Sequence, residues 1–345
     1  MKKYVLLIML SVLITFICNA QNKPVKIIFD TDMLTDPEDV NALCLLHAFA
    51  DEGEAEILAC VANGYEANRA SGAAIDVVNT FYHRPDIPIG TYKGGFTNKR
   101  SAYTYKLRDH FPHDAPNDDQ LPSSLTVYRQ TLAGQPDHSV VIVSVGFLLN
   151  VKDLLDSKPD KYSDFSGKEL IQKKVKGLVV MGGKYPEGRE YNFYYGGVAP
   201  AAKGVVDNWP DELPILFSGY EIGEFIIQGK NYKNQLPLCP LRTALESAYN
   251  IPLDDANNCL NAGRHGWDES AVICAIRGLS HNGVEYWKTQ SVGSVLVDCC
   301  DGSNTWVSSP DKNQAYLIES MAPDSLASLM EHYVLKSIQN AMKKQ

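Results

Sequence analysis

Five acidic side chains lie within ten positions near the start of the chain. They follow a short β-branched and aromatic run at 25–29, which predicts a buried strand, and they precede an apolar segment at 40–50, which predicts a helix. Ligands bind at such strand-to-helix turns in open parallel sheets, and the helix dipole tolerates acids there. Carboxylates this dense repel one another, so the pattern favours either a solvated turn with a capping acid or an oxygen-ligand site for Ca²⁺ or Mg²⁺. The five are Asp30, Asp32, Asp36, Glu38 and Asp39.

Strand and helix patterns alternate along most of the chain after this turn. Such alternation predicts an α/β fold with an open, mainly parallel, doubly wound sheet and helices on both of its faces. The segment 93–122 is polar and rich in loops, and we interpret it as an insertion that covers a pocket. The segment 286–319 predicts two strands joined by a turn at the edge of the sheet. Further strands are predicted at 55–62, 87–92, 139–145, 175–181 and 213–218, and further helices at 70–82, 123–132, 151–156 and 324–342.

The first twenty residues have the pattern of a signal peptide. Two lysines precede an uncharged apolar run that is too short to span a membrane, and the small Ala20 precedes the expected cleavage site. We therefore expect residues 1–20 to be removed and residues 21–345 to form a single secreted or periplasmic domain without a membrane span. Cys18 leaves a lipoprotein as an alternative, which the bulky Ile17 disfavours.

Charge and cysteine spacing exclude two classes of function. The formal net charge is −9, with no basic stripe, which argues against nucleic acid as a partner. The eight cysteines include no C-x-x-C pair, which excludes a zinc ribbon. Cys44 and Cys60 lie in apolar segments typical of a core. The pattern leaves a small molecule as the expected partner, and it leaves disulfide pairing and a homo-oligomer open.

Four motifs, in order, resemble those of the inosine–uridine-preferring nucleoside hydrolases. The acid turn 30–39 is similar to their opening D-x-D followed by a paired acid, in a variant with two extra residues. The segment 146–150 (GFLLN) resembles G-P-L-T-N, the segments 181–183 and 190–192 resemble M-G-G and E-F-N, and Asp268 opens a later apolar helix. The resemblance implies a Ca²⁺-dependent enzyme that cleaves the N-glycosidic bond of ribonucleosides into ribose and free base, as in purine and pyrimidine salvage.

The resemblance also implies a set of calcium ligands. Asp32, Asp39 and Asp268 would bind the ion through their carboxylates, and Asp32 would also act as general base on the attacking water. Leu149 stands where the family has Thr, but that residue contributes its backbone carbonyl, so the exchange is tolerable. Asp30 would brace the loop.

The sugar pocket follows from the same resemblance. Glu38 would hold ribose hydroxyls, and Asn63, Glu190 and Asn192 would complete the pocket. The ribose gains oxocarbenium character as its bond to the base breaks, which nearby carboxylates favour. A divalent ion would orient the sugar and a water molecule for the attack.

The sequence departs from the family at three positions. Leu34 replaces a Gly of the acid turn, and Glu38 is one methylene longer than the usual Asp, which shifts its carboxylate by about 1 Å. Trp267 replaces a His that protonates the leaving base; its indole cannot do so, but it can stack on a base or simply pack in the core. Acid candidates are His265, Tyr191 and Tyr194.

Other functions stay in competition with nucleoside hydrolysis. The same fold and pocket can serve a related N-riboside or an ADP-ribose-like compound, or a catalytically weak ribose-binding protein. A phosphatase with an Asp nucleophile also has F-D-T-D after a strand, but the following Met33-Leu34 does not fit that class. A phosphatase would also give no role to Glu190, Asn192 and Asp268.

Overall fold

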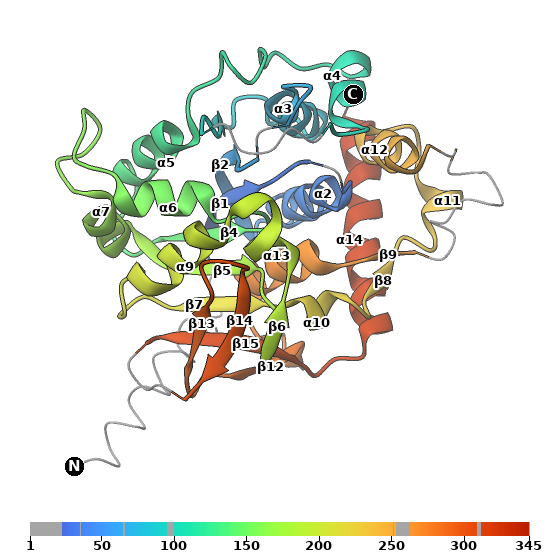
Figure 1. Cartoon of the computed structure of the whole chain (residues 1–345). Coiled ribbons are helices and arrows are strands. Elements are labelled where there is room, and N and C mark those ends of the chain that lie inside the picture. Colours follow the sequence, from blue (N-terminus) through green and yellow to red (C-terminus); the bar gives the residue numbers. More distant parts are fainter. Residues whose placement is uncertain are drawn as a thin grey trace.

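An eight-stranded sheet runs through the centre of the structure, a computed structural model (Figure 1). The described residues are 23–34, 36–64, 66–94, 100–250, 252, 263–308 and 312–344. The expected signal peptide at 1–20, including Cys18, lies outside them. No helix in these described ranges combines the length and the apolar character that crossing a membrane requires.

The central sheet has the order β12-β15-β7-β5-β4-β1-β2-β3, and every neighbouring pair is parallel except β12 with β15. The mainly parallel sheet expected from the sequence is therefore confirmed. From β1 the chain builds outward in both directions, so the carboxyl ends of β1 and β4 flank a switch point, where open α/β sheets bind ligands. The strands are β1 (Val25–Thr31), β2 (Ala55–Ala62), β3 (Ile89–Thr91), β4 (Val140–Ser144), β5 (Val175–Met181), β7 (Ile215–Ser218), β12 (Trp287–Gln290) and β15 (Gln314–Glu319).

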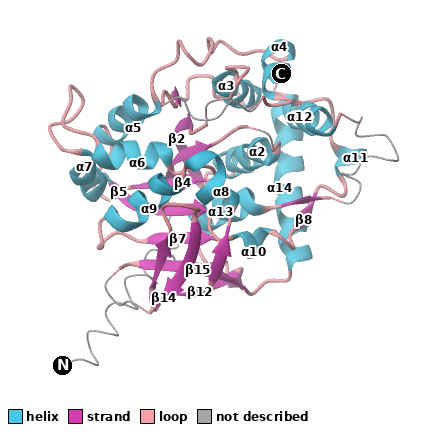
Figure 2. Ribbon diagram, viewed as in Figure 1, coloured by secondary structure: helices cyan, strands magenta, loops and turns pink. Residues whose placement is uncertain are grey.

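Helices cover both faces of this sheet (Figure 2). Each face has its own hydrophobic core, because side chains alternate along each strand: Ile27 and Phe29 point into one core and Ile28 into the other. One core is covered by α2 (Glu38–Asp51), α3 (Ser71–Phe81), α4 (Thr104–His110), α12 (Pro240–Tyr249), α13 (Trp267–Arg277) and α14 (Pro323–Lys343). The other is covered by α5 (Ser124–Ala133), α6 (Leu149–Asp156), α7 (Gly167–Lys174) and α9 (Ala199–Asn208).

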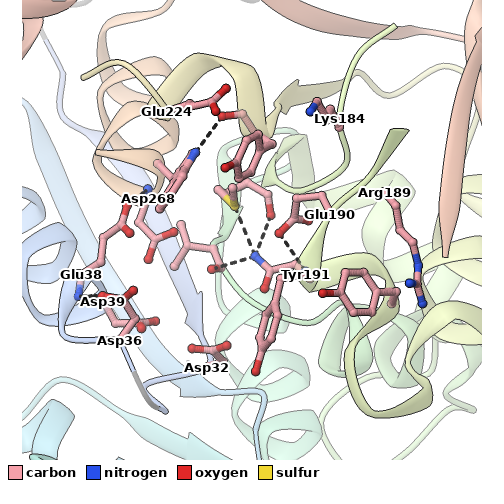
Figure 3. A pocket seen from close by; sticks show the side chains of 16 residues that line it. Asp32, Asp36, Glu38, Asp39, Lys184, Arg189, Glu190, Tyr191, Glu224 and Asp268 are labelled. Carbon is pink, nitrogen blue, oxygen red and sulfur yellow. Dashed lines mark hydrogen bonds between the residues drawn. The ribbon is translucent and has the colours of Figure 1, made fainter. Parts of the chain in front are cut away.

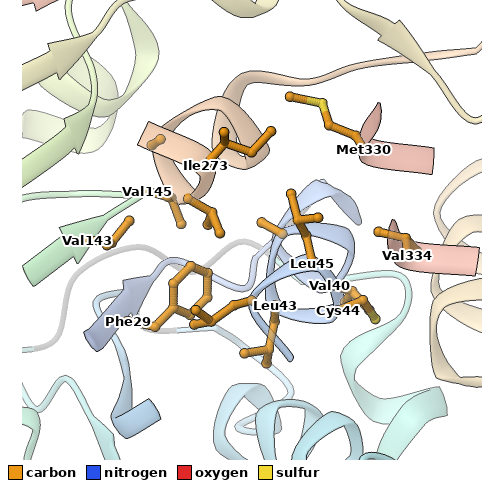
Figure 4. Close-up of a cluster of buried hydrophobic side chains, with 14 of the residues drawn as sticks. Phe29, Val40, Leu43, Cys44, Leu45, Val143, Val145, Ile273, Met330 and Val334 are labelled. Carbon is orange, nitrogen blue, oxygen red and sulfur yellow. The ribbon is translucent and has the colours of Figure 1, made fainter. Parts of the chain in front are cut away.

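The core beside β1 holds the helices that begin at the acid turn and at Asp268. Phe29, Leu43 and Ile273 come from β1, α2 and α13 and gather in one buried cluster (Figure 4). Cys44 and Cys60 belong to the same core and are buried, as expected. The amino ends of α2 and α13 are thereby held next to each other.

A second sheet forms where the sequence predicted a single strand–turn–strand unit. The segment 286–319 contains four strands instead of two: β12 and β15 extend the central sheet, whereas β13 (Ser294–Val297) and β14 (Ser303–Val307) form a hairpin. The expectation was wrong here because only one of the reversals, the turn near 301–304, carries a strong sequence signal. The hairpin pairs through β14 with β6 (Glu187–Arg189) in an antiparallel three-stranded sheet.

The remaining elements are short. The described part of the segment 93–122 contains α4, which packs on α3, so this segment is less irregular than expected. The other elements are α8 (Tyr191–Tyr194), η1 (Tyr195–Gly197), α10 (Tyr220–Gly223), α11 (Tyr232–Gln235), and the strand pairs β8 (Ile227–Gln228) with β9 (Arg264–His265) and β10 (Ser280–His281) with β11 (Val284–Glu285).

Met330 of α14 supports the start of α13. It is fully buried, and its Sδ would lie 3.2 Å from a Cβ placed on Gly266, next to the first turn of α13. We expect Met330→Ala to lower the free energy of unfolding by about 2–5 kcal/mol, measured by urea denaturation, because it leaves a cavity in the core. Met342→Ala on the same helix is the matched control; Met342 is 40% exposed, so its loss should change stability by less than about 0.5 kcal/mol. Equal effects of the two substitutions would contradict this packing.

Candidate active site

A cavity of about 550 Å³ opens at the carboxyl ends of β1, β4 and β5 (Figure 3). Seven of the ten residues singled out in the sequence line it: Asp32, Glu38, Asp39, Glu190, Asn192, Trp267 and Asp268. They come from three distant parts of the chain, so the structure brings most of the predicted site together. Asp30, Asn63 and Leu149 are not among the lining residues, and neither is any described residue of the segment 93–122.

The acid turn is bent by a residue other than the one expected. Met33 has a left-handed backbone with φ of 40°, a conformation that costs an ordinary residue roughly 1–2 kcal/mol. Its amide N–H donates to Asp39 Oδ1 at 3.1 Å, and the Thr31 hydroxyl donates to the same oxygen. Leu34, in place of the family Gly, is fully buried in a small cluster with Phe147. The turn therefore folds over its own carboxylate, with Leu34 as a hydrophobic anchor.

Asp30 lies beneath the cavity and braces the neighbouring loops. Its Oδ1 accepts hydrogen bonds from Asn63 Nδ2 at 2.7 Å and Asn150 Nδ2 at 3.0 Å, and its Oδ2 accepts one from the Tyr128 hydroxyl at 2.7 Å. Burial raises the pKa of Asp30 to about 7, against these three donors, which lower it. The carboxyl group thus ties β1 to the loop after β2, to α5 and to the first turn of α6.

Asn63 and Leu149 belong to this support. Asn63 is fully buried; its amide donates to Asp30, and its Oδ1 accepts the Phe147 N–H at 3.0 Å. The structure therefore places Asn63 under the cavity and not in its wall. Gly146 allows the close approach, since a Cβ there would lie 2.7 Å from the Asp32 nitrogen. Leu149 is the first residue of α6 and packs beside the Leu34 cluster; its role as a carbonyl ligand stays a prediction.

Asp32, Asp39 and Asp268 face one another across the cavity. Burial, and then the negative charge of Asp39, raise the pKa of Asp32 well above its usual range. The pKa of Asp268 is also raised well above its usual range, first by burial and then by the charge of Asp39, with a smaller contribution from Asp32. The interaction between Asp32 and Asp39 raises the pKa of Asp32 and lowers that of Asp39, so the proton is held on Asp32. The three groups therefore form one electrostatic unit whose full ionisation requires a compensating charge.

The donor set of this unit suits a hard divalent cation. Carboxylate oxygens are the ligands that Ca²⁺ prefers, and buried carboxylates that raise one another's pKa gain most from such an ion. Among the described residues, three metal-ligand atoms lie within 4.8 Å of one another only at Asp298, Cys299 and Cys300, which are exposed. The carboxylate oxygens of Asp32, Asp39 and Asp268 are therefore farther apart than in a closed metal site. The ligand type of these three side chains and their position around one cavity fit calcium, and the distance between them leaves space.

Glu38 joins the two helices that carry the metal-ligand candidates. Its Oε1 accepts the backbone N–H of Asp268 at 2.8 Å, so the side chain reaches from the first turn of α2 to that of α13. Burial, followed by the charges of Asp268 and Glu269, raises the pKa of Glu38 well above its usual range. The extra methylene relative to Asp is what gives Glu38 this reach. Its expected contact with ribose hydroxyls stays a prediction.

Glu190 and Asn192 form the opposite wall. Backbone N–H groups of Gly183 and Asn192 donate to the two carboxylate oxygens of Glu190 at 3.0 and 2.9 Å. Burial raises the pKa of Glu190 to about 7, although these donors lower it. The Asn192 amide nitrogen donates to the backbone oxygens of Val145 and Met181 at 3.3 and 3.2 Å. Both side chains are thus fixed at the ends of β4 and β5.

Trp267 forms an aromatic wall. Its indole N–H donates to the Tyr220 backbone oxygen at 2.7 Å, and its ring lies 5.3 Å from the Tyr220 ring. His265 stacks on Trp267 at 4.4 Å and is not a lining residue, and its Nδ1 contacts the Glu224 backbone oxygen at 2.7 Å. His265 therefore supports the wall from behind. Of the acid candidates from the sequence, Tyr191 and Tyr194 do line the cavity.

Sequence reasoning missed four polar or charged lining residues: Lys184, Arg189, Tyr220 and Glu224. All four lie in loops or short elements that follow the carboxyl ends of β5 and β7, where open parallel sheets bind ligands. That position was the available signal, but residue type alone did not distinguish them from ordinary surface residues.

The raised pKa values predict how stability depends on pH. A carboxyl group whose pKa is raised by folding binds its proton more tightly in the folded chain, so stability is lost as the pH rises through that range. Asp30, Glu190 and Glu269 are each raised to about 7 from ordinary values of 3.8 or 4.5, on the order of 3 kcal/mol each once ionised. We expect the melting temperature of chelated protein to fall between about pH 4 and about pH 7, and excess Ca²⁺ to reverse this fall. The melting temperature is measured by scanning calorimetry, with NaCl of equal ionic strength in place of Ca²⁺ as the control. A melting temperature that does not change with pH in the absence of metal would contradict the burial of these carboxyl groups.

Comparisons with known proteins identify solved structures that share this architecture. No protein-family model and no curated protein matches the chain. Among solved structures, the type III effector protein XopQ complexed with adenosine diphosphate ribose is 13% identical, covers 96% of this chain and 99% of its own, and has a TM-score of 0.66. The plant nucleoside hydrolase PpNRh1 is 16% identical (90% and 99% covered, TM-score 0.61), and an inosine–guanosine nucleoside hydrolase is 17% identical (92% and 98% covered, TM-score 0.61). The chain therefore has the fold that nucleoside hydrolases and XopQ share, and the likeness does not single out the inosine–uridine-preferring group.

Proposed function

We propose that this chain hydrolyses the N-glycosidic bond of ribonucleosides in a Ca²⁺-dependent reaction that yields ribose and a free base. The observation that carries the proposal is the convergence of Asp32, Asp39 and Asp268 on one cavity with an aromatic wall. The nucleoside-hydrolase fold supports it. A site of this kind suits a ligand with a hydroxyl-rich ring at one end and a flat base at the other.

Each side chain of the acidic end has a defined task in this proposal. Asp32, Asp39 and Asp268 would hold Ca²⁺, with the Leu149 carbonyl as a further ligand. The bound ion would supply positive charge that orients ribose hydroxyls and a water molecule. Asp32 would accept the proton of that water as the water oxygen bonds to C1′ and the C1′–N bond breaks, with the electrons of that bond leaving on the base.

The walls of the cavity position the ribose and the base. Glu190 and Asn192 are fixed by backbone contacts and would hold the sugar, while Glu38 would contact its hydroxyls and keep Asp268 in place. Their carboxylates favour the positive charge that develops on the ribose ring. Trp267 would stack on the base, and tyrosine hydroxyls of the wall are the available proton donors for the leaving group.

A second candidate is a related N-riboside or ADP-ribose-like substrate, or ribose binding with little turnover. Glu38 and Trp267 depart from the nucleoside-hydrolase pattern, and XopQ, which shares the fold, is complexed with adenosine diphosphate ribose.

For either candidate we propose export through the expected signal peptide 1–20, so the protein would act on ribosides outside the cytoplasm.

A panel of nucleosides, assayed for released ribose with and without chelator, tests the proposal. We expect turnover with Ca²⁺, loss with chelator, and a kcat at least about 10²-fold lower for Asp32→Asn, because the general base and a metal ligand are removed together. Asp211→Asn makes the same chemical change on the exposed surface and should retain wild-type rates. Wild-type rates in Asp32→Asn would refute the general-base role, and saturable Ca²⁺-dependent ribose binding without turnover would favour the binding protein.

Trp267 gives a separate test of base stacking. We expect Trp267→Ala to raise KM by about 5- to 100-fold through loss of base stacking, whereas Trp267→Phe should keep most of the affinity. His265→Ala is the matched control for the aromatic stack, since it removes the ring behind Trp267 without opening the cavity. A KM that does not respond to Trp267→Ala would show that the indole only packs.

A further inference from the structure

We propose that the cavity has a second, basic end, formed by Lys184 and Arg189, that binds the phosphate of a phosphorylated riboside. This inference rests on the proposed N-riboside hydrolysis and specifies its substrate class. Seven of the lining residues are acidic, and these two are the basic ones among them. In Figure 3 they lie on the side of the cavity away from Glu38, Asp39 and Asp268.

Lys184 is held in place through its backbone and has an unneutralised side chain. The Asn304 side chain accepts the Lys184 N–H at 2.9 Å and donates to its carbonyl at 2.8 Å, which fixes the residue against β14. The ammonium lies 5.1 Å from the centre of the Tyr220 ring. Burial raises the pKa of Glu221, a nearby carboxyl group that accepts the Tyr185 N–H at 3.0 Å, and the charge of Lys184 opposes this rise. In the described residues, Lys184 forms no ion pair within 4.0 Å.

Arg189 is oriented more tightly. Its guanidinium carbon lies 3.9 Å from the centre of the Tyr194 ring, and its Nε donates to the Asp301 backbone oxygen at 2.6 Å. These contacts use one face and one N–H of the guanidinium, and within the described part of the chain no carboxylate pairs with it. A guanidinium held in this way is suited to paired hydrogen bonds with a phosphate group.

The two ends of the cavity differ in charge, and this difference orients a ligand. The acidic end would carry Asp32, Asp36, Glu38, Asp39 and Asp268 against one Ca²⁺, so it stays less favourable for a phosphate than the end with Lys184 and Arg189. Glu190 lies on the side of the basic pair in Figure 3, but both of its carboxylate oxygens accept backbone N–H groups. A riboside with a phosphate or diphosphate satisfies both ends at once, with the sugar at the acids and the anion at the basic pair. The volume of about 550 Å³ lies in the range of cavities that hold ligands larger than a sugar alone.

Paired substrates that differ only in the phosphate test this inference. We would measure kcat/KM for inosine and inosine 5′-monophosphate, and for adenosine and adenosine 5′-diphosphate, with Ca²⁺ present. We expect the wild-type chain to prefer the phosphorylated member, and the K184A/R189A variant to lower the ratio of phosphorylated to unphosphorylated at least tenfold. Arg189→Lys keeps the charge but not the fork, so it should give a partial loss.

Lys161→Ala is the matched control, because Lys161 also lies over a tyrosine ring, 4.9 Å from the centre of Tyr162, but is not a lining residue. Its ratio should equal the wild-type value. An equal ratio in wild type and K184A/R189A, or a wild-type preference for the unphosphorylated member, would overturn the inference while leaving riboside hydrolysis intact. If no riboside is hydrolysed, the proposed function fails, and calorimetric titration with ADP-ribose still decides: binding that K184A/R189A weakens tenfold supports the basic end, and equal or absent binding overturns it.

Discussion

The burial of like-charged carboxyl groups in one place is the constraint on which this structure depends. Burial disfavours the ionisation of Asp32, Asp39 and Asp268, and the charge of Asp39 adds to this effect at Asp32 and Asp268. Such an arrangement is unfavourable for a folded chain unless something compensates for it, by protonation or by a cation. Much of the surrounding architecture serves to hold these groups against their mutual repulsion.

Short-range contacts at the switch point of the sheet hold these carboxyl groups in place. Asp30 connects β1 to the loop after β2 and to the first turn of α6, and Gly146 lets the loop after β4 approach the backbone of Asp32. Glu38 joins the amino ends of α2 and α13, and the strained turn at Met33 is stabilised by the Asp39 carboxylate. Strain at the acid turn is thus maintained by the same groups that the proposed chemistry requires.

Much of the fold could be predicted from the sequence, because alternating strand and helix patterns are local. The acid turn and Asp268 could be recognised by motif, although nothing in the local pattern of Asp268 indicates that it faces Asp32. Other features depend on contacts between distant segments. The position of His265 behind Trp267, the reach of Glu38 to α13 and the buried place of Asn63 are set by tertiary packing. The hairpin of β13 and β14 was missed because its strands are short and only one of the chain reversals was recognisable.

The three-stranded sheet separates two properties of the cavity. Asn304 and Asp301, at β14 and the turn before it, hold Lys184 and Arg189, whereas the acid turn and α13 are anchored in the central sheet and its core. β6 is hydrogen-bonded to β14 and to no strand of the central sheet among the described residues. Exchanges in this hairpin can therefore alter the proposed phosphate-binding end without touching the carboxylates of the central sheet, so ligand preference could vary on an unchanged scaffold.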